Sequence, residues 1–393
     1  MDSKAQSPIS LDSSLAKCDF QRILLIKPSA LGDVVHTIPL LVKLRSRFPS
    51  ARIDWMLTPE NAELLRCHPA LSGIVLFQRK RFSGFGMNWA ASFSALRLLW
   101  QIYKTHYDLI IDMHGQLRSA LFTLASRAPV RIGFDRPTPN LSWEKIPVAE
   151  GGRGWNGARE GSWMAYTHRL RITTLDVHAI DRYLWVGRFL GFDETNPDTT
   201  LYLPREAEHD IESLLASYQL GKPLILLVPG AMWETKRWPP RRFAEVGQYF
   251  HEKGYSVIAA GTKNERSICE EVSGHCPQIL NFAGKTPTPA YLAALIRKAA
   301  LCITNDSASM HLAVALKRPV VSIFGPTNPV CVGPYKNPEA VVRANVPCSP
   351  CNFRKLTQCH QGHICVWDVT SQMVIERARI VCNAANEAHF FGG

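Results

Sequence analysis

Residues 304–311 (TNDSASMH) combine small, polar and charged side chains at a point where an apolar strand pattern gives way to a helical one. At such a junction the free backbone N–H groups and the helix dipole create a binding site for phosphate. Asp306 and Ser307 supply a carboxylate and a hydroxyl, and the small Ala308 permits close approach of a pyrophosphate. The alternative is that Asp306 and Ser307 only cap the helix, which their residue types also favour.

A second loop, residues 229–239 (PGAMWETKRWP), also follows a predicted strand and precedes a helix whose first turn holds Pro239 and Pro240. Lys236 in this loop is well placed to meet the leaving phosphate of a nucleotide. A Lys–Arg pair between two tryptophans is also typical of a solvated surface turn. Because both loops leave the same edge of one predicted sheet, together they predict a pyrophosphate pocket.

Two further carboxylates follow strands in positions suited to chemistry. Glu265 comes after the next strand of the second half, where an acidic residue commonly binds the ribose hydroxyls of a nucleotide. Asp33 opens a helix in the first half, where it could take a proton from an acceptor hydroxyl. The alternatives are an exposed residue in a first helical turn for Glu265 and a helix N-cap for Asp33.

Alternating strand and helix patterns predict the elements that hold these residues. Short apolar runs predict parallel strands at 22–26, 52–57, 73–77, 108–113, 130–134, 223–230, 255–261, 300–306 and 319–325. Helical spacing predicts helices at 34–48, 178–190, 239–253, 263–273, 288–299 and 307–317. The chain is therefore expected to be an α/β protein with two Rossmann-like domains, since 393 residues exceed the usual size of one core.

The predicted domain plan has four parts. A flexible leader occupies residues 1–20, and an N-terminal domain spans 21–205, including a long Gly-, Arg- and Trp-rich loop at 151–171. The turn-rich segment 192–208 is read as the linker to a C-terminal domain at 206–375. Residues 376–393 are expected to form a tail or helix that packs back on the N-terminal domain.

Composition limits the cell compartment and the class of partner. No apolar run reaches the roughly 18–20 residues of a membrane-spanning helix, and the N-terminus is polar, so we expect a cytoplasmic protein. The net charge of +12 favours anionic partners such as phosphorylated substrates or membrane surfaces. Basic runs interleaved with aromatic residues are missing from the sequence, so nucleic acid is not expected as a partner.

Several blocks together resemble the ADP-heptose:lipopolysaccharide heptosyltransferases, glycosyltransferase family 9, in order and spacing along nearly the whole chain. The main blocks are KPSALGDVVHTIPLL at 27–41, PGAMWETKRWPP at 229–240 and NDSASMHLA at 305–313. Shorter blocks at 112–120 (DMHGQLRSA), 132–135 (IGFD) and 178–184 (HAIDRYL) agree as well. The resemblance implies a GT-B fold, with an ADP-sugar donor in the C-terminal domain, the acceptor in the N-terminal domain and inversion at the anomeric carbon.

The resemblance also implies residue roles. Asp33 matches the proposed catalytic base, and Lys236 matches the lysine that stabilises the departing diphosphate. The expected nucleotide-sugar ligands are Glu265 at the adenosine ribose, together with Thr235, Asp306, Ser307, Ala308 and His311. Ala308 stands where glycine is frequent, and Ala231 and Met232 replace a polar pair, so some phosphate hydrogen bonds of relatives are not expected here.

An inverting displacement needs a base beside the acceptor and stabilisation of negative charge beside the donor. The chain lacks an Asp-x-Asp motif that could hold a divalent ion against a diphosphate, so metal-independent catalysis without a cofactor is expected. The implied acceptor is an anionic glycolipid of the lipid A and Kdo type, met at the cytoplasmic face of the inner membrane. The first loop is closest to enzymes that add the first heptose to Kdo.

Candidate acceptor ligands are cations of the first half: Lys27, Arg79, Arg81, Arg118 and Arg136. Plain surface exposure is the alternative for each of them. The apolar and aromatic stretch from Phe82 to Trp100 is read as a contact with lipid, a cover over the acceptor cleft or a packed amphipathic helix.

A cysteine cluster lies near the end of the chain and by itself suggests a structural zinc knuckle: Cys348, Cys351, Cys359 and Cys365. A second CxxC pair is missing, so we predict a thiol-rich structural loop without metal. Three other functions remain open from the sequence: a glycosyltransferase that uses another ADP- or NDP-sugar, a nucleotide-sugar epimerase on the same fold, and a binding module that has lost its chemistry. The retention of both Asp33 and Lys236 argues against the binding module.

Overall fold

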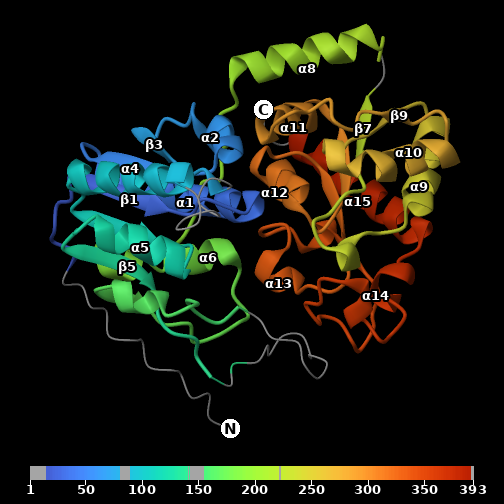
Figure 1. Cartoon of the computed structure of the whole chain (residues 1–393). Coiled ribbons are helices and arrows are strands. Elements are labelled where there is room, and N and C mark those ends of the chain that lie inside the picture. The colour runs from blue at the N-terminus through green and yellow to red at the C-terminus, as the bar shows by residue number, and fades with distance from the viewer. Residues whose placement is uncertain (1–14, 80–88, 140, 142–154, 221–222, 391–393) are drawn as a thin grey trace.

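The computed structural model describes residues 15–79, 89–139, 141, 155–220 and 223–390. The described strands form two parallel sheets, one in each half of the chain (Figure 1). The first sheet contains β1 Arg22–Ile26, β2 Arg52–Leu57, β3 Gly73–Leu76, β4 Leu109–Asp112, β5 Val130–Phe134 and β6 His168–Leu170. The second contains β7 Leu224–Val228, β8 Ser256–Ala259, β9 Leu280–Asn281, β10 Leu301–Asn305, β11 Val320–Phe324 and β12 Val341–Arg343.

The two sheets share one topology. Their strand orders are β3-β2-β1-β4-β5-β6 and β12-β11-β10-β7-β8-β9, so the order reverses beside β1 in the first sheet and beside β7 in the second. In open parallel sheets, ligands bind beyond the carboxyl ends of the strands at such reversal points. The loops after β1, β7 and β10 are therefore the expected site, and they hold Asp33, Lys236 and Asp306.

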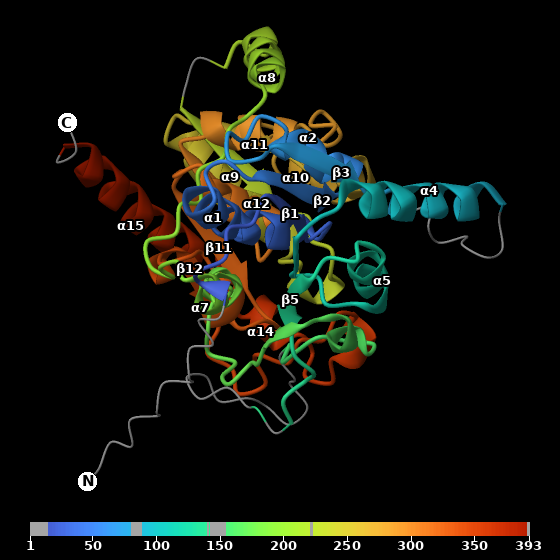
Figure 2. The same ribbon diagram turned by 90° about the vertical axis from the view of Figure 1, so that its left-hand side faces the viewer.

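Helices cover both faces of each sheet (Figures 1 and 2). Those of the first half are α1 Leu31–Arg47, α2 Pro59–Leu65, α4 Trp89–Thr105, α5 Leu117–Ala125, α6 Ala179–Leu184 and α7 Gly187–Leu190, and α8 Arg205–Ser217 leads into the second half. The second half has α9 Pro240–Glu252, α10 Arg266–His275, α11 Pro289–Lys298, α12 Ala308–Ala315, α13 Pro329–Val332, α14 Ile364–Trp367 and α15 Ser371–Phe390. No helix among the described residues is both long and apolar enough to cross a membrane.

The strands predicted from continuous apolar runs are confirmed, and the central ones, such as β4, β7, β10 and β11, are buried on both faces. The prediction of residues 151–171 as one long loop was wrong for its described part, where β6 pairs in parallel with β5. The strands β9 and β12 and the helix α8 were not predicted either. These strands have two or three residues, too few to show a periodic pattern.

The two halves contact each other directly. Helix α1 packs against α12 and α2 packs against α11, and buried side chains of both halves join in one continuous hydrophobic core. The start of α8 coincides with the domain boundary expected near residue 205. The two halves are therefore joined by a packed interface as well as by the segment of chain that connects them.

The tail helix does not follow its prediction over the residues whose side chains are described. Helix α15 packs against α9 and β11 of the second half, and Ala378 and Val381 are buried in that half's core. Arg377 adds an ion pair to Glu339 at 2.6 Å. The apolar face of this helix is thus covered by its own half and not by the N-terminal domain.

Candidate active site

The first loop of the candidate site joins β10 to α12. Ser307 is the N-cap residue of α12 and makes no side-chain cap hydrogen bond, so no side-chain cap occupies the first N–H groups of the helix. The Ser307 hydroxyl instead lies 3.0 Å from that of Thr304. The alternative interpretation, in which Asp306 caps the helix, is not what the geometry shows. The helix N-terminus has the donors that an anion needs.

Asp306 forms an ion pair with Lys236. The Lys236 Nζ lies 2.6 Å from Asp306 Oδ2, and the Asp306 side chain is almost fully buried. The Thr327 hydroxyl also donates to this carboxylate, and Lys236 Nζ lies 4.4 Å from the centre of the Trp233 ring. Lys236 is therefore held at the N-terminus of α12, and it is not a solvated surface charge.

Asn305 fixes the second loop to the first. Its amide Nδ2 donates to the Pro229 carbonyl at 2.7 Å, and its Oδ1 accepts from the Trp238 N–H at 3.0 Å. These two bonds span the start and the end of the loop that carries Lys236. Asn305 is fully buried, so the two predicted phosphate loops form one rigid unit.

Thr235 lies beside Lys236 in the short helix η3 (Glu234–Lys236), and it is buried. Its hydroxyl donates to the Phe353 carbonyl at 2.5 Å, and its own carbonyl lies 2.6 Å from His363 Nε2. In this structure the Thr235 hydroxyl is therefore engaged within the protein. Its contacts fasten the Lys236 loop to the cysteine-containing segment 348–365.

Glu265 comes to the same edge of the sheet from the loop after β8. Its Oε2 accepts from the N–H and the hydroxyl of Thr262, both at 2.8 Å. Its carboxylate also lies over Gly230, where a Cβ atom would stand 2.1 Å from Glu265 Oε1. A side chain at position 230 would therefore displace the Glu265 carboxylate, and glycine lets this carboxylate lie against the Lys236 loop.

On the first half, Asp33 lies in the first turn of α1 and points to Lys27 and Tyr183. Lys27 Nζ lies 3.3 Å from Asp33 Oδ2, and the Tyr183 hydroxyl lies 3.3 Å from Oδ1. The N-cap of α1 is Ala30, so the N-cap alternative for Asp33 is excluded. The Asp33 side chain keeps 42% of its exposure, which leaves it open to a substrate.

Burial alone raises the pKa of Asp33, but the charge and hydrogen bond of Lys27 outweigh it, and the net result is a lowered pKa. Opposing effects also set the pKa of Lys27. Burial lowers this pKa, but the charges of Asp33 and Tyr183 outweigh burial, and the net result is a raised pKa. Burial, then the charge of Asp33, raises the pKa of Tyr183 to about 12. At neutral pH Asp33 is therefore an ionised carboxylate held by a protonated lysine and a neutral phenol.

A hydrogen bond between two histidines links the two halves. His36 Nε2 of α1 lies 2.9 Å from His311 Nδ1 of α12, and both rings are buried. Gly32 allows the helices to approach, because a Cβ atom there would stand 2.7 Å from His311 Cδ2. His178 joins them with its ring centre 5.0 Å from that of His36 and its Nε2 3.0 Å from the Gly333 carbonyl.

His311 is the point where the charges of both halves meet. Burial lowers its pKa to about 4, and the charges of Asp306, Lys236 and Asp33 act on it from the two sides. These three groups are the predicted donor and acceptor machinery. The structure thus brings Asp33, Lys236, Asp306 and His311 together around one point between the sheets.

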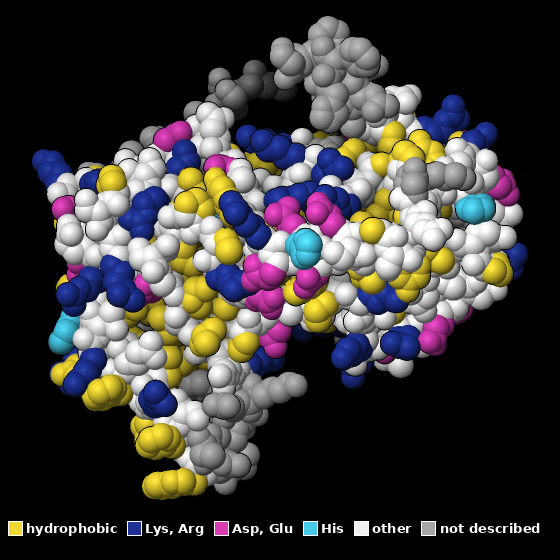
Figure 3. All heavy atoms as spheres, turned by 90° about the horizontal axis from the view of Figure 1, so that it is seen from above, with side chains coloured by type: hydrophobic (Ala, Val, Ile, Leu, Met, Phe, Trp, Pro, Cys, Tyr) yellow, Lys and Arg dark blue, Asp and Glu magenta, His cyan; other side chains and the backbone are white. Residues whose placement is uncertain are grey.

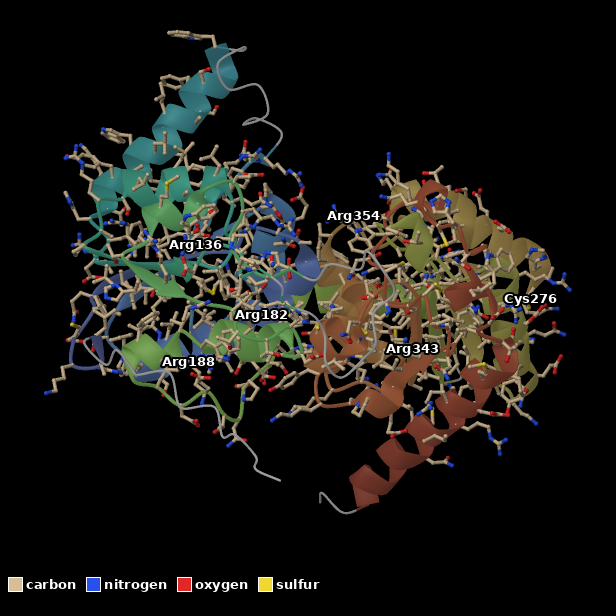
Figure 4. The ribbon with its side chains drawn as sticks, turned by 90° about the horizontal axis from the view of Figure 1, so that it is seen from below. Arg136, Arg182, Arg188, Cys276, Arg343 and Arg354 are labelled. Atoms are coloured by element: carbon tan, nitrogen blue, oxygen red, sulfur yellow. The ribbon has the colours of Figure 1, made fainter. Side chains whose placement is uncertain are left out.

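The predicted acceptor cations are divided by the structure. Lys27 is buried beside Asp33, whereas Arg79, Arg118 and Arg136 are exposed, and Figure 4 marks Arg136 on the first half. Arg81 lies outside the described residues.

Arg182 is a buried cation to which sequence reasoning gave no role. Its Nη1 and Nη2 are 3.4 Å from the carbonyls of Trp155 and Val177, its Nε has no partner, and the charge of Asp33 acts on it. Figure 4 shows Arg182 on the side of the first half that faces the second. The sequence block at 178–184 could have pointed to Arg182, because it contains His178, Arg182 and Tyr183 within six consecutive positions.

The four clustered cysteines are free thiols. Among the described residues, no group of three or more His, Cys, Asp or Glu side chains is placed to hold a metal ion. The segment that carries these cysteines packs on the Lys236 loop, where Arg354 lies 4.9 Å from the Trp233 ring centre. It also contacts the loop after β11, where the Asn352 N–H donates to the Pro326 carbonyl at 2.7 Å. The absence of metal at this segment stays a prediction.

Comparison with known proteins identifies relatives of this chain. The family model described as glycosyltransferase family 9 (heptosyltransferase) matches residues 95–361. Lipopolysaccharide heptosyltransferase 1 of Pseudomonas aeruginosa is 29% identical over 335 residues, which cover 84% of this chain and 86% of that protein. Lipopolysaccharide heptosyltransferase 3 of Escherichia coli K12 is 28% identical over 313 residues, 77% of this chain and 82% of that protein.

Solved structures give the same fold. A glycosyl transferase family 9 structure from Veillonella parvula aligns with a TM-score of 0.73 at 22% identity, covering 95% of this chain and all of that one. The E. coli heptosyltransferase WaaC with ADP aligns with a TM-score of 0.69 at 20% identity, covering 92% of this chain and 100% of that one. The predicted GT-B fold, two parallel-sheet domains that face each other, is confirmed.

Proposed function

We propose that this chain, which belongs to glycosyltransferase family 9, transfers heptose from ADP-heptose to the inner core of lipopolysaccharide with inversion at the anomeric carbon. Family membership makes the protein a glycosyltransferase. The donor, the acceptor and the stereochemistry are the proposal. The block at 27–41, which resembles that of enzymes adding the first heptose, supports Kdo as the accepting sugar, and similarity to P. aeruginosa lipopolysaccharide heptosyltransferase 1 is compatible with this proposal.

The observation that carries the proposal is the meeting of two unlike charge systems at His311. Asp33 supplies a carboxylate with a lowered pKa from the first half. Lys236 and the uncapped N-terminus of α12 supply positive charge from the second half. A sugar transferred between an acceptor hydroxyl and a diphosphate needs these two systems on opposite sides of the reacting carbon.

In the proposed reaction, the acceptor oxygen bonds to the anomeric carbon of the sugar while Asp33 accepts the proton of that hydroxyl. The bond from the anomeric carbon to the diphosphate oxygen breaks at the same time. Lys236 turns from Asp306 toward the leaving diphosphate, whose negative charge replaces that of the carboxylate. The N–H groups of α12 stabilise the same charge. Glu265 binds the ribose. Lys236 and the helix N-terminus perform the charge stabilisation, so the reaction is proposed to need neither a divalent metal ion nor a cofactor.

The acceptor side supports an anionic glycolipid. Lys27 and Arg182 are buried cations beside Asp33, and Arg182 has no carboxylate partner within hydrogen-bonding distance among the described residues. A carboxylate of the acceptor sugar would complete the guanidinium contacts. We propose that the protein meets this acceptor at the cytoplasmic face of the inner membrane.

The test is a turnover assay with ADP-heptose and a Kdo-bearing lipid A acceptor in the presence of EDTA. We expect heptosylated product and release of ADP, with no gain on adding Mg²⁺. Asp33→Asn is expected to lose turnover by about 10²–10⁴-fold while it still binds ADP, measured by thermal shift. Lys236→Met is expected to lower turnover as well and to weaken ADP binding.

Four results would contradict parts of the proposal. Turnover of a heptosylated core acceptor but not of the Kdo acceptor would assign a later step of core assembly. Preference for a UDP- or GDP-sugar, or loss of turnover in EDTA, would overturn the donor or the metal independence. Undiminished turnover in Asp33→Asn would remove Asp33 as the base.

A further inference from the structure

Helix α4 exposes a stripe of large apolar side chains. Trp89, Phe93, Leu96, Trp100 and Tyr103 recur every three or four residues, so they share one face of the helix. Trp89 is 87% exposed and Trp100 is 58% exposed. The opposite face, with Ala95, Leu98 and Ile102, is buried against the first sheet and its neighbours. The helix is thus apolar on two sides, and only one side is covered.

Neighbouring elements extend this stripe. Helix α5 packs beside α4 and exposes Leu117, Leu121 and Leu124, and the short helix η2 (Ser162–Ala165) packs against α5 and exposes Met164. We call these side chains of α4, α5 and η2 the apolar platform. Figure 2 shows α4 projecting well beyond the body of the molecule. Isolated exposed apolar residues are ordinary, but a contiguous platform of this extent marks a binding surface.

The charges within the platform are of one sign. Helices α4 and α5 contain Arg97, Lys104 and Arg118 and no acidic residue, and Arg127 follows α5. Lys104 Nζ lies 4.2 Å from the Trp100 ring centre, and the Arg127 guanidinium lies 5.1 Å from that of Tyr103. Glu160 accepts from the Leu117 N–H at one end. In Figure 3 yellow side chains alternate with dark blue ones along the projecting part of the first half.

The α5 end of the platform lies next to the candidate active site. Strand β4 leads into α5 and pairs with β1, so that Asp112 lies opposite Ile26, the residue before Lys27. An acceptor whose sugar lies at Asp33 therefore has the platform within reach of its lipid part. A glycolipid has a polar sugar part joined to an apolar lipid part, so it requires a polar site next to an apolar surface with basic residues at its edge.

We propose that the apolar platform docks the protein on an anionic lipid bilayer, with the aromatic and leucine side chains in the interfacial region and the four cations at the phosphate headgroups. This inference rests on the proposed glycolipid acceptor and names the surface that meets its membrane. Tryptophan, tyrosine and basic residues on one helix face are the side chains that settle at a bilayer interface. Each cation adds attraction to anionic headgroups.

The occupant is a bilayer and not a second copy of the chain. In a symmetric pairing of two platforms, Arg97, Lys104, Arg118 and Arg127 of one copy would face a surface whose α4 and α5 charges are also positive, and like charges repel at short range. The α4 and α5 side chains offer no acidic partner for those cations. Anionic headgroups supply the missing negative charge.

The experiment measures vesicle binding of the full chain without donor or acceptor. Vesicles of phosphatidylethanolamine and phosphatidylglycerol are compared with vesicles of phosphatidylcholine by flotation. We expect binding to the anionic vesicles that falls as salt is raised. Trp89→Ser/Trp100→Ser should lower the partition coefficient about tenfold or more, and Arg97→Gln/Lys104→Gln about fivefold for each charge.

Trp367→Ser is the matched control, because Trp367 is an exposed tryptophan on α14 of the second half. It should bind like the wild type, and all variants should keep the wild-type melting temperature. Binding that is unchanged in the Trp89/Trp100 variant, or equal on neutral vesicles, overturns the proposal. Self-association of the wild type that this variant abolishes would assign the platform to a second copy. A water-soluble, delipidated acceptor should be turned over equally by all variants, so failure of docking is distinguishable from failure of the proposed function.

Discussion

At the residue scale, the chemistry of Asp33 depends on Lys27. A general base must be ionised to accept a proton, so the lowered pKa of Asp33 sets the acidic limit of activity below the ordinary range of a carboxylate. Removal of the lysine charge in Lys27→Met leaves the burial that raises the pKa. We expect the acidic limb of the kcat/KM profile to move to higher pH.

The measurement is kcat/KM for the acceptor across pH in the wild type, Lys27→Met and Lys27→Arg. Lys27→Arg keeps a cation beside the carboxylate, so its profile should stay close to that of the wild type. An unchanged acidic limb in Lys27→Met would mean that another group limits activity at low pH.

Residues at strand ends were visible in the sequence, whereas their partners were not. Asp33, Lys236, Asp306 and Glu265 follow apolar runs, and parallel strands send their carboxyl ends to one edge. The pairing of His36 with His311 joins positions 275 residues apart. No local pattern encodes that distance, and the same holds for the bonds of Asn305 to both ends of the Lys236 loop.

At the scale of elements, the position of Asp33 relative to the donor loop depends on how closely α1 approaches α12. Gly32→Ala would place a Cβ atom 2.7 Å from the His311 ring, so one helix or the ring must move. We expect the free energy of unfolding to fall by about 1–3 kcal/mol and turnover to fall with it. The loss of stability should be much smaller when Gly32→Ala is made in a His311→Ala background, because the clash is then absent.

Urea unfolding of the two single variants and the double variant measures this coupling. Gly274→Ala is the control, because Gly274 lies in α10 and a Cβ atom there meets nothing within 4 Å. This change should leave stability equal or slightly higher, since alanine favours a helix. Additive losses in the double variant would contradict a direct contact between Gly32 and His311.

The strand predictions were correct where burial on both faces of the sheet determines the residue types. The central strands read as unbroken apolar runs because helices cover both faces of each sheet. At the edges, β6, β9 and β12 have little burial and few residues, so pairing with a neighbour determines them. The start of α1 at Leu31, three residues before the prediction, is decisive for function because it puts Asp33 inside the first turn.

At the scale of the whole molecule, three buried histidines lie where the halves meet. Burial, then the charge of neighbouring histidines, lowers the pKa of His36 well below its ordinary value, and burial lowers the pKa of His178 and His311 to about 4. The charges of Lys27 and Arg182 lower the pKa of His36 further. The neutral forms are therefore the folded forms, and protonation favours separation or unfolding of the halves.

The sign of the pH dependence follows from these lowered pKa values. Above the ordinary histidine pKa of about 6.5 neither the folded nor the unfolded state binds the protons, and stability is complete. As pH falls toward 4, these histidines bind protons in the unfolded state but stay neutral in the folded state, so the free energy of unfolding falls. Burial and the neighbouring charges that lower the pKa of His36 make this residue a contributor to the loss of stability between pH 7 and pH 5.

His36→Gln, which keeps a hydrogen-bonding group toward His311, should therefore lose less stability than the wild type over that interval. Urea unfolding at the two pH values checks the difference, with His209→Gln on the exposed face of α8 as the control. Equal losses in the wild type and His36→Gln would show that the contact between the halves stays closed by packing of α1 on α12 alone.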